Sequence, residues 1–134
     1  MKTSTQWIPK SLLALMLMLA IQAPAQAGEP EAKVFHVVIC WLQEAGNHAA
    51  RAQLIAGSKK LEAIPGVLSV QAGTLLASPR PIVDSSYDVG IIMSFASVEA
   101  MHAYLQNPLH KQAVQELLLP LTSKVVIYDF ALPH

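Results

Sequence analysis

The sequence predicts an α+β domain in which four antiparallel strands form one sheet. Three observations point to this fold class: four short segments rich in β-branched and aromatic residues, helical patterns after the first and the third of them, and turn residues at the junctions. The resulting order, β-α-β-β-α-(α)-β, is the split βαβ pattern of ferredoxin-like domains. Right-handed crossovers then put the first and third strands in the middle of the sheet.

Ahead of this pattern, residues 1–27 have the parts of a secretory signal peptide. Lys2 and Lys10 give a positive start, residues 11–21 form an unbroken apolar run, and Ala25-Gln26-Ala27 supplies small residues before a cut. The apolar run is shorter than the ~20 residues that cross a bilayer, so we expect no stable membrane anchor. An uncleaved anchor is the alternative.

Cleavage before Gly28 would leave a single domain, residues 28–134, which we expect to be secreted into a bacterial periplasm. Without Lys2 and Lys10 the chain keeps seven basic and nine acidic side chains, a formal charge of −2. There is no basic patch, so nucleic acid is not an expected partner. Cys40 is the single cysteine, and its apolar neighbours predict a buried, unreactive thiol.

The first strand and helix have clear signals. Residues 34–42 (VFHVVICWL) are apolar on both faces, as in a central strand. Asn47 is a good N-cap for a helix whose apolar positions recur at helical spacing, and Pro65-Gly66 ends that helix.

The middle of the chain predicts two more strands. Residues 67–76 are more polar than the first strand, so we expect them near an edge of the sheet. Residues 77–86 contain two prolines and predict a loop. Residues 87–95 (YDVGIIMSF) predict a strongly apolar third strand.

The last part predicts a broken helix and a final strand. Ser97 is an N-cap, and Asn107-Pro108 ends one helix and starts another, with Asn as cap and Pro at the first helical position. Leu109, Ala113 and Leu117 form the apolar side of the second helix, which we expect to end at Pro120. Residues 124–132 predict the fourth strand.

One face of this sheet would have no cover. Helices protect the other face, and a 107-residue domain has nothing left for this one, although its strands are very apolar. Two such sheets packed face to face would bury both open faces. The sequence therefore predicts a homodimer.

Several short motifs resemble those of a known family. They are Phe35-His36-Val37-Val38, Ile64-Pro65-Gly66-Val67, Gly73, Ser94-Phe95-Ala96-Ser97, the Y-x-x-x-P-x-H segment from Tyr104 to His110, and Ile127-Tyr128-Asp129-Phe130. Over residues 33–130 the chain resembles the stress-responsive dimeric α/β-barrel (Dabb) domain family. The resemblance implies a dimeric α+β barrel formed by two four-stranded sheets. Members include plant stress proteins and a branch of polyketide cyclases, in which an acid/base pair closes a linear polyketide by an intramolecular aldol reaction.

His110 and Tyr104 are the candidate catalytic residues. His110 lies in the first turn after Asn107-Pro108, where unpaired N–H groups and the helix dipole disfavour a positive imidazole. A neutral imidazole suits a general base near neutral pH. By resemblance, the two residues match the catalytic His and its partner Tyr of the cyclase branch. The alternative is a structural role, in which both fix the corner between two helices.

His36 and Val89 are the candidate ligand-pocket residues. His36 shares an apolar face of the first strand with Val38 and Cys40, where its ring nitrogens need a partner. The resemblance places it facing the barrel cavity. The cyclase branch has a further pocket His on the third strand, where this chain has Val89, so its constellation is incomplete. Asp88 should point to the opposite face from Val89.

Other chemistry has little support in the sequence. The only residues that could form a metal cluster are His36, His102, His110 and Asp88, and no pair has a tight ligand spacing. We expect no metal and no cofactor, since there is no Gly-rich phosphate loop, no G-x-S-x-G motif and nothing that marks a redox site for a haem- or quinol-oxidising barrel.

The function expected from the sequence is therefore that of an exported homodimer which binds a small apolar or aromatic ligand in the barrel cavity. The alternative is an acid/base enzyme, a cyclase-like lyase that uses His110 and Tyr104.

Overall fold

The computed structural model describes residues 1, 3 and 32–133. The predicted signal peptide, apart from Met1 and Thr3, lies outside the described residues. Within the described part of the chain, no helix is both long and apolar enough to span a bilayer.

The four predicted strands form one antiparallel sheet with the order β2-β3-β1-β4. Their bounds are β1 (Val34–Leu42), β2 (Val67–Thr74), β3 (Val89–Phe95) and β4 (Thr122–Ala131). The two most apolar segments, β1 and β3, lie in the middle, and the more polar β2 lies at an edge. This order confirms the split βαβ fold predicted from the sequence.

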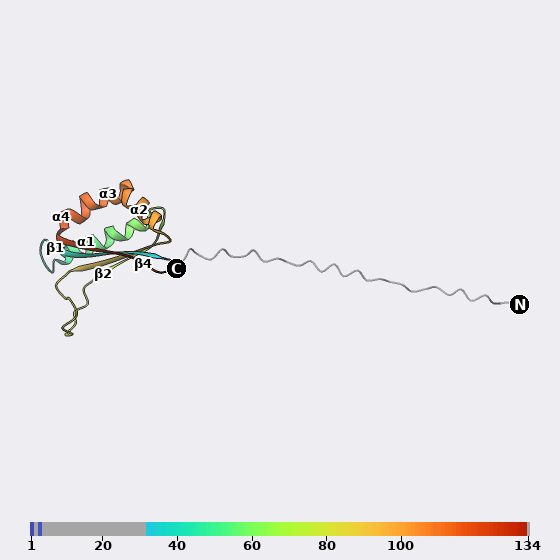
Figure 1. The fold of residues 1–134 in the computed structure, drawn as a ribbon, viewed down its shortest axis with the longest axis horizontal. Helices are drawn as coiled ribbons and strands as arrows, with labels where there is room; N and C mark the ends of the chain where they lie inside the picture. Colours follow the sequence, from blue (N-terminus) through green and yellow to red (C-terminus); the bar gives the residue numbers. More distant parts are fainter. Residues whose placement is uncertain (2, 4–31, 134) are drawn as a thin grey trace.

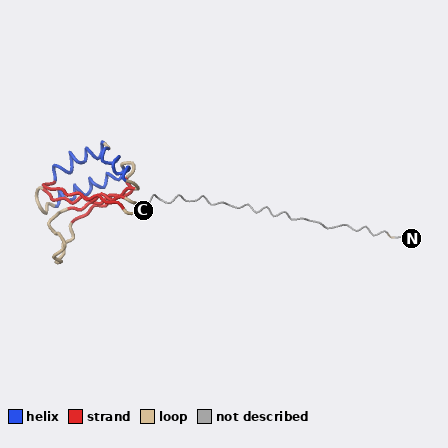
Figure 2. The backbone as a smooth tube through the Cα atoms, in the orientation of Figure 1, coloured by secondary structure: helices blue, strands red, loops and turns tan. Residues whose placement is uncertain are grey.

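The helices all cover one face of the sheet (Figures 1 and 2). They are α1 (His48–Lys59), the short 3₁₀ turn η1 (Lys60–Ala63), α2 (Val98–Gln106), α3 (Pro108–Ala113), η2 (Val114–Leu118) and α4 (Leu119–Leu121). Each predicted N-cap is confirmed, because the side chains of Asn47, Ser97 and Asn107 accept hydrogen bonds from backbone N–H groups in the first turn that follows.

The last helical segment differs from its prediction. Pro120 does not end it, because α4 continues to Leu121. Proline has no N–H to donate, and its ring clashes with the carbonyl four residues earlier in a regular α-helix. Here η2 is a π-helical turn, in which the N–H of Leu119 reaches the carbonyl of Val114, and this wider turn immediately precedes Pro120. Leu109, expected on the apolar side, is instead 54% exposed.

Asp88 ties three parts of the fold together. Its carboxylate accepts hydrogen bonds from the backbone N–H groups of Leu42 and Gly46, and it pairs with Arg51 of α1. Burial alone would raise the pKa of Asp88, but these hydrogen bonds and the positive charge of Arg51 outweigh it and lower the pKa below its usual value. The turn between β1 and α1 is thereby fixed to the start of β3.

The two faces of the sheet differ in what covers them. Along β1, residues alternate between buried side chains under the helices and half-buried ones on the other face. Cross-strand pairing places further apolar side chains on this second face, such as Ile92 and Tyr128, which lie opposite Val37. We call it the open face. Its large apolar residues are Phe35, Val37, Ile39, Trp41, Ile92, Val126, Tyr128 and Phe130.

Candidate functional site

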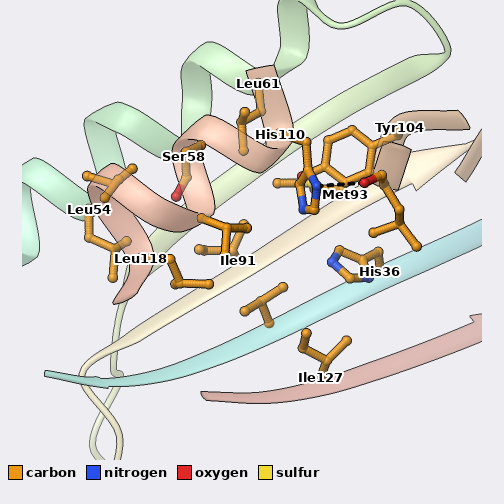
Figure 3. A pocket seen from close by; sticks show the side chains of 15 residues that line it. His36, Leu54, Ser58, Leu61, Ile91, Met93, Tyr104, His110, Leu118 and Ile127 are labelled. Carbon is orange, nitrogen blue, oxygen red and sulfur yellow. Dashed lines mark hydrogen bonds between the residues drawn. The ribbon is translucent and has the colours of Figure 1, made fainter. Parts of the chain in front are cut away.

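A cavity of about 190 Å³ lies between the sheet and the helices (Figure 3). Most of its wall is apolar, and the polar side chains in it are few. The lining residues are His36, Val38, Leu54, Ser58, Leu61, Ile91, Met93, Tyr104, Leu105, His110, Ala113, Val114, Leu117, Leu118 and Ile127. An apolar pocket with a few converging polar groups is the usual form of a small-molecule site.

His110 reaches the cavity from the first turn of α3. The Asn107 cap and Pro108 start the helix there, and the ring turns back so that Nδ1 lies 3.1 Å from the carbonyl oxygen of Leu105. A carbonyl can only accept, so Nδ1 carries the proton and donates it in this hydrogen bond. In the neutral imidazole, Nε2 is then free to accept a proton.

The surroundings of His110 keep its ring neutral. Burial is the largest effect and lowers its pKa, the hydrogen bond to Leu105 opposes this, and the nearby His36 and Lys111 lower it further. The sequence prediction of a neutral ring agrees with this direction. The main cause is burial, whereas the sequence argument relied on the helix N-terminus.

Tyr104 lies beside His110 in the wall of the cavity. Its side chain is almost fully buried, and its ring centroid is 4.5 Å from that of His110 and 6.1 Å from that of His36. Burial raises the pKa of the Tyr104 hydroxyl far above its usual range. The hydroxyl therefore keeps its proton and can act as a hydrogen-bond donor.

His36 enters the cavity from the sheet and has an acidic partner. Its Nδ1 lies 2.6 Å from Oδ1 of Asp129, which is directly opposite in the β1–β4 pairing. A carboxylate accepts hydrogen bonds, so Nδ1 of His36 carries a proton and donates it to Asp129. Asp129 was missed as a site residue. It stands two residues after Ile127 on the same face of an apolar strand, so alternation could have placed it on that face but not opposite His36.

Three of the four predicted site residues meet in this cavity, and the fourth does not. His36, Tyr104 and His110 lie together, whereas Val89 is fully buried in the core at the start of β3 and is not part of the lining. Ile91 and Met93 are the β3 residues that line the cavity. Asp88 also points elsewhere, toward the turn that it anchors.

The cavity lies on the helical side of the sheet. The sequence placed the ligand inside a barrel formed by two sheets, which would be on the open face. His36 belongs to the buried face of β1, under the helices, so it faces this cavity and not the open face.

Groups outside the cavity do not add chemistry to it. His48 and His102 are exposed, and the described residues contain no group of three or more His, Cys, Asp or Glu side chains that could hold a metal ion. Cys40 is fully buried, and burial raises its pKa to about 11, so its thiol stays protonated and unreactive.

Comparison with protein families gives a match over residues 34–132 to the stress responsive A/B barrel domain, Dabb. The chain belongs to this family. No curated protein matches it.

Solved structures agree with this assignment of the Dabb domain. A Dabb family protein with a ferredoxin-like fold from Mesorhizobium loti is 26% identical, with a TM-score of 0.63 over 78% of this chain and 100% of that one. A dimeric ferredoxin-like protein of unknown function from Thermobifida fusca is 22% identical, with a TM-score of 0.61 over 75% of this chain and 92% of that one. A hydroxynitrile lyase from Passiflora edulis is 20% identical, with a TM-score of 0.66 over 78% and 96%. At 22% and 20% identity, the similarity to the last two structures is a similarity of fold alone.

Proposed function

We propose that this Dabb domain binds a small, largely apolar molecule that carries one carbonyl or hydroxyl group. The observation behind the proposal is the distribution of polar groups in the cavity. Three of the four polar side chains in its wall, those of Tyr104, His110 and His36, gather at one end. The other end has Leu54 and Leu118, with Ser58 as its one polar side chain (Figure 3). A ligand with an apolar body and one polar group would match this arrangement.

The size of the cavity favours a ligand of one ring. An engineered cavity of ~150 Å³ lined by Leu, Ile and Phe binds benzene. The cavity of this domain, at about 190 Å³, has room for an aromatic ring with a short polar substituent.

A cavity-filling variant tests this proposal. Ala113 lines the cavity, and Ala113→Leu should abolish saturable binding of benzyl alcohol and benzaldehyde, measured by ligand-observed NMR. Ala103 is exposed on α2, so Ala103→Leu is a matched control that should bind like the wild type. Equal binding by the two variants would contradict a site in this cavity.

A second candidate is the acid/base enzyme, favoured by the state of His110. Its Nε2 can take a proton from a substrate, and the Tyr104 hydroxyl beside it can donate a hydrogen bond to a carbonyl oxygen. These two roles suit the making or breaking of a carbon–carbon bond next to a carbonyl, as in an aldol cyclisation. The Passiflora protein is described as a lyase that acts on hydroxynitriles, and its likeness in fold adds modest support.

Turnover of mandelonitrile to benzaldehyde, followed by absorbance, is a direct assay of this candidate. His110→Gln should lower the rate about 100-fold or more, the usual contribution of a general base, while exposed His102→Gln should leave it unchanged. If His110→Gln lowers the melting temperature and leaves turnover of every carbonyl compound unchanged, the residue has the structural role instead.

We also propose that the domain is a homodimer joined through the open face. The fold neighbour from Thermobifida fusca and one from Bacteroides fragilis are described as dimeric, and the open face of this chain is apolar.

We further propose that residues 1–27 direct export of the protein and are then removed. Amino-terminal sequencing of the protein from the periplasm of an expressing bacterium should begin at Gly28; a start at Met1 would contradict it.

A further inference from the structure

The loop between β2 and β3, residues 75–88, extends from the sheet on the side opposite the helices (Figures 1 and 2). It therefore lies on the same side as the open face. Leu76 is 85% and Ile82 is 89% exposed, more than any other large apolar side chain in residues 32–133. An exposed isoleucine at the tip of a loop is unfavourable in water unless something else covers it.

The base of this loop is held in place, so Ile82 is kept away from its own domain. The N–H of Leu75 donates to the carbonyl of Asp88 at 3.2 Å, and Nε1 of Trp41 donates to Oγ of Ser86 at 3.1 Å. At the tip, Val83 N–H donates to the carbonyl of Arg80 at 3.0 Å. The two prolines of the loop restrict it further.

The open face also contains a hollow of about 370 Å³. Two glycines cause it, because Gly73 and Gly90 lie opposite each other in the β2–β3 pairing and neither has a side chain. A Cβ atom at Gly73 would have nothing within 4 Å. The remaining wall is mostly apolar and is formed by Val37, Ile39, Gln71, Ala72, Ile91 and Ile92.

We propose that Ile82 of one copy of this chain enters the Gly73/Gly90 hollow of a second copy, and the reverse. The inference rests on the proposed dimer and names one contact that would join its two subunits. One surface then carries both a projecting apolar side chain and an apolar hollow, which is the self-complementarity that a two-fold symmetric interface needs. Face-to-face packing of the open faces also brings the loop of each copy toward the sheet of the other.

Filling the hollow tests the proposal by sedimentation equilibrium of the full-length mature protein. The Cβ atom of Gly73→Leu has nothing of its own chain within 4 Å, and the rest of the side chain would occupy the hollow, so the variant should raise the dimer dissociation constant about 100-fold. Ile82→Ala should raise it about 10-fold. Thr74→Leu, next in sequence but on the other face of β2, and Val83→Ala in the same loop are the matched controls and should leave the constant unchanged.

A cysteine pair tests the contact itself. Ile82→Cys and Gly73→Cys chains, co-expressed with different affinity tags, should form an interchain disulfide in the mixed dimer, and neither variant should form it alone. Native Cys40 is fully buried and does not compete. A wild-type dimer with unchanged association in Gly73→Leu and no mixed disulfide would overturn the inference and leave the proposed dimer intact. A monomeric wild type would overturn both.

Discussion

His110 combines a fixed tautomer with a ring kept neutral by its surroundings. The Leu105 carbonyl determines which nitrogen carries the proton, and burial makes the charged form costly. Both effects follow from the short break at Asn107-Pro108, which turns the ring back toward the preceding helix. The same residue could therefore serve either to recognise a ligand or to take a proton from it.

The lowered pKa of His110 predicts a pH dependence of stability. The unfolded chain keeps the ordinary value of 6.5, and the folded pKa lies below it. Between the two values the unfolded state binds more protons, so the free energy of unfolding increases with pH in this window and decreases on acidification. We expect the melting temperature of wild type to fall between about pH 7 and about pH 5, and that of His110→Gln to fall less.

The control for this experiment is His102→Gln, because His102 is exposed on α2. This variant should keep the wild-type slope of melting temperature against pH. Only the slopes are compared, since His110→Gln also loses the hydrogen bond to Leu105. Equal slopes for His110→Gln and wild type would show that His110 does not cause the pH dependence of the melting temperature.

The sequence predicted three of the cavity residues but did not identify Asp129, the hydrogen-bond partner of His36. His36, Tyr104 and His110 stand out by residue type and by motif. Asp129 becomes a partner of His36 only through the register of β1 against β4, and a pattern of apolar residues does not determine which residues of two strands lie opposite each other. Val89 was inferred from alignment to a motif, and the cavity does not extend that far along β3.

At the scale of elements, close packing of two helices shapes one wall of the cavity. A Cβ atom at Gly57 of α1 would overlap the side chain of Leu117 in η2, so only glycine lets the two segments approach this closely. Leu117 lines the cavity, and the position of η2 therefore influences the space left for a ligand.

We expect Gly57→Ala to push Leu117 toward the cavity and to weaken binding of the one-ring probes at least 10-fold, although alanine is the better helix former. The double variant Gly57→Ala with Leu117→Val should regain most of the affinity, because valine leaves room for the new methyl group. Isothermal titration calorimetry with benzyl alcohol measures the affinity of the single and the double variant. Unchanged affinity in Gly57→Ala would mean that η2 moves outward instead.

Element order and strand positions were predictable because each strand and each cap has a local signal. The strand bounds differ by at most two residues: β2 ends at Thr74, β3 begins at Val89 and β4 begins at Thr122. The π turn of η2 was not predictable. It depends both on the proline at position 120 and on the packing of η2 against α1, and hydrophobic periodicity reports neither.

At the scale of the whole molecule, the open face predicts association. Tyr128 is 60% and Phe130 is 49% exposed on β4, and Phe130 stacks on Phe35 with 5.2 Å between ring centroids. Large exposed aromatic side chains on a sheet are favourable once a partner covers them.

A charge on this face should separate the subunits. We expect the wild type to be a dimer at micromolar concentration in analytical ultracentrifugation and Tyr128→Arg to be a monomer, because each subunit of a Tyr128→Arg dimer would bury an unpaired charge. Gln53→Arg, an exposed change on α1, should stay dimeric. The secondary structure of Tyr128→Arg, measured by circular dichroism, should match wild type; a dimeric Tyr128→Arg would place the interface elsewhere.

The alternation of side chains along β1 has a consequence for how such a protein can change over time. His36 faces the cavity, and its neighbours Phe35 and Val37 face the open side. Substitutions at His36 and Val38, the residues of this strand that line the cavity, can therefore alter what is bound, and those at odd-numbered positions can alter what the subunit associates with. Ligand choice and assembly can be selected separately within nine consecutive residues.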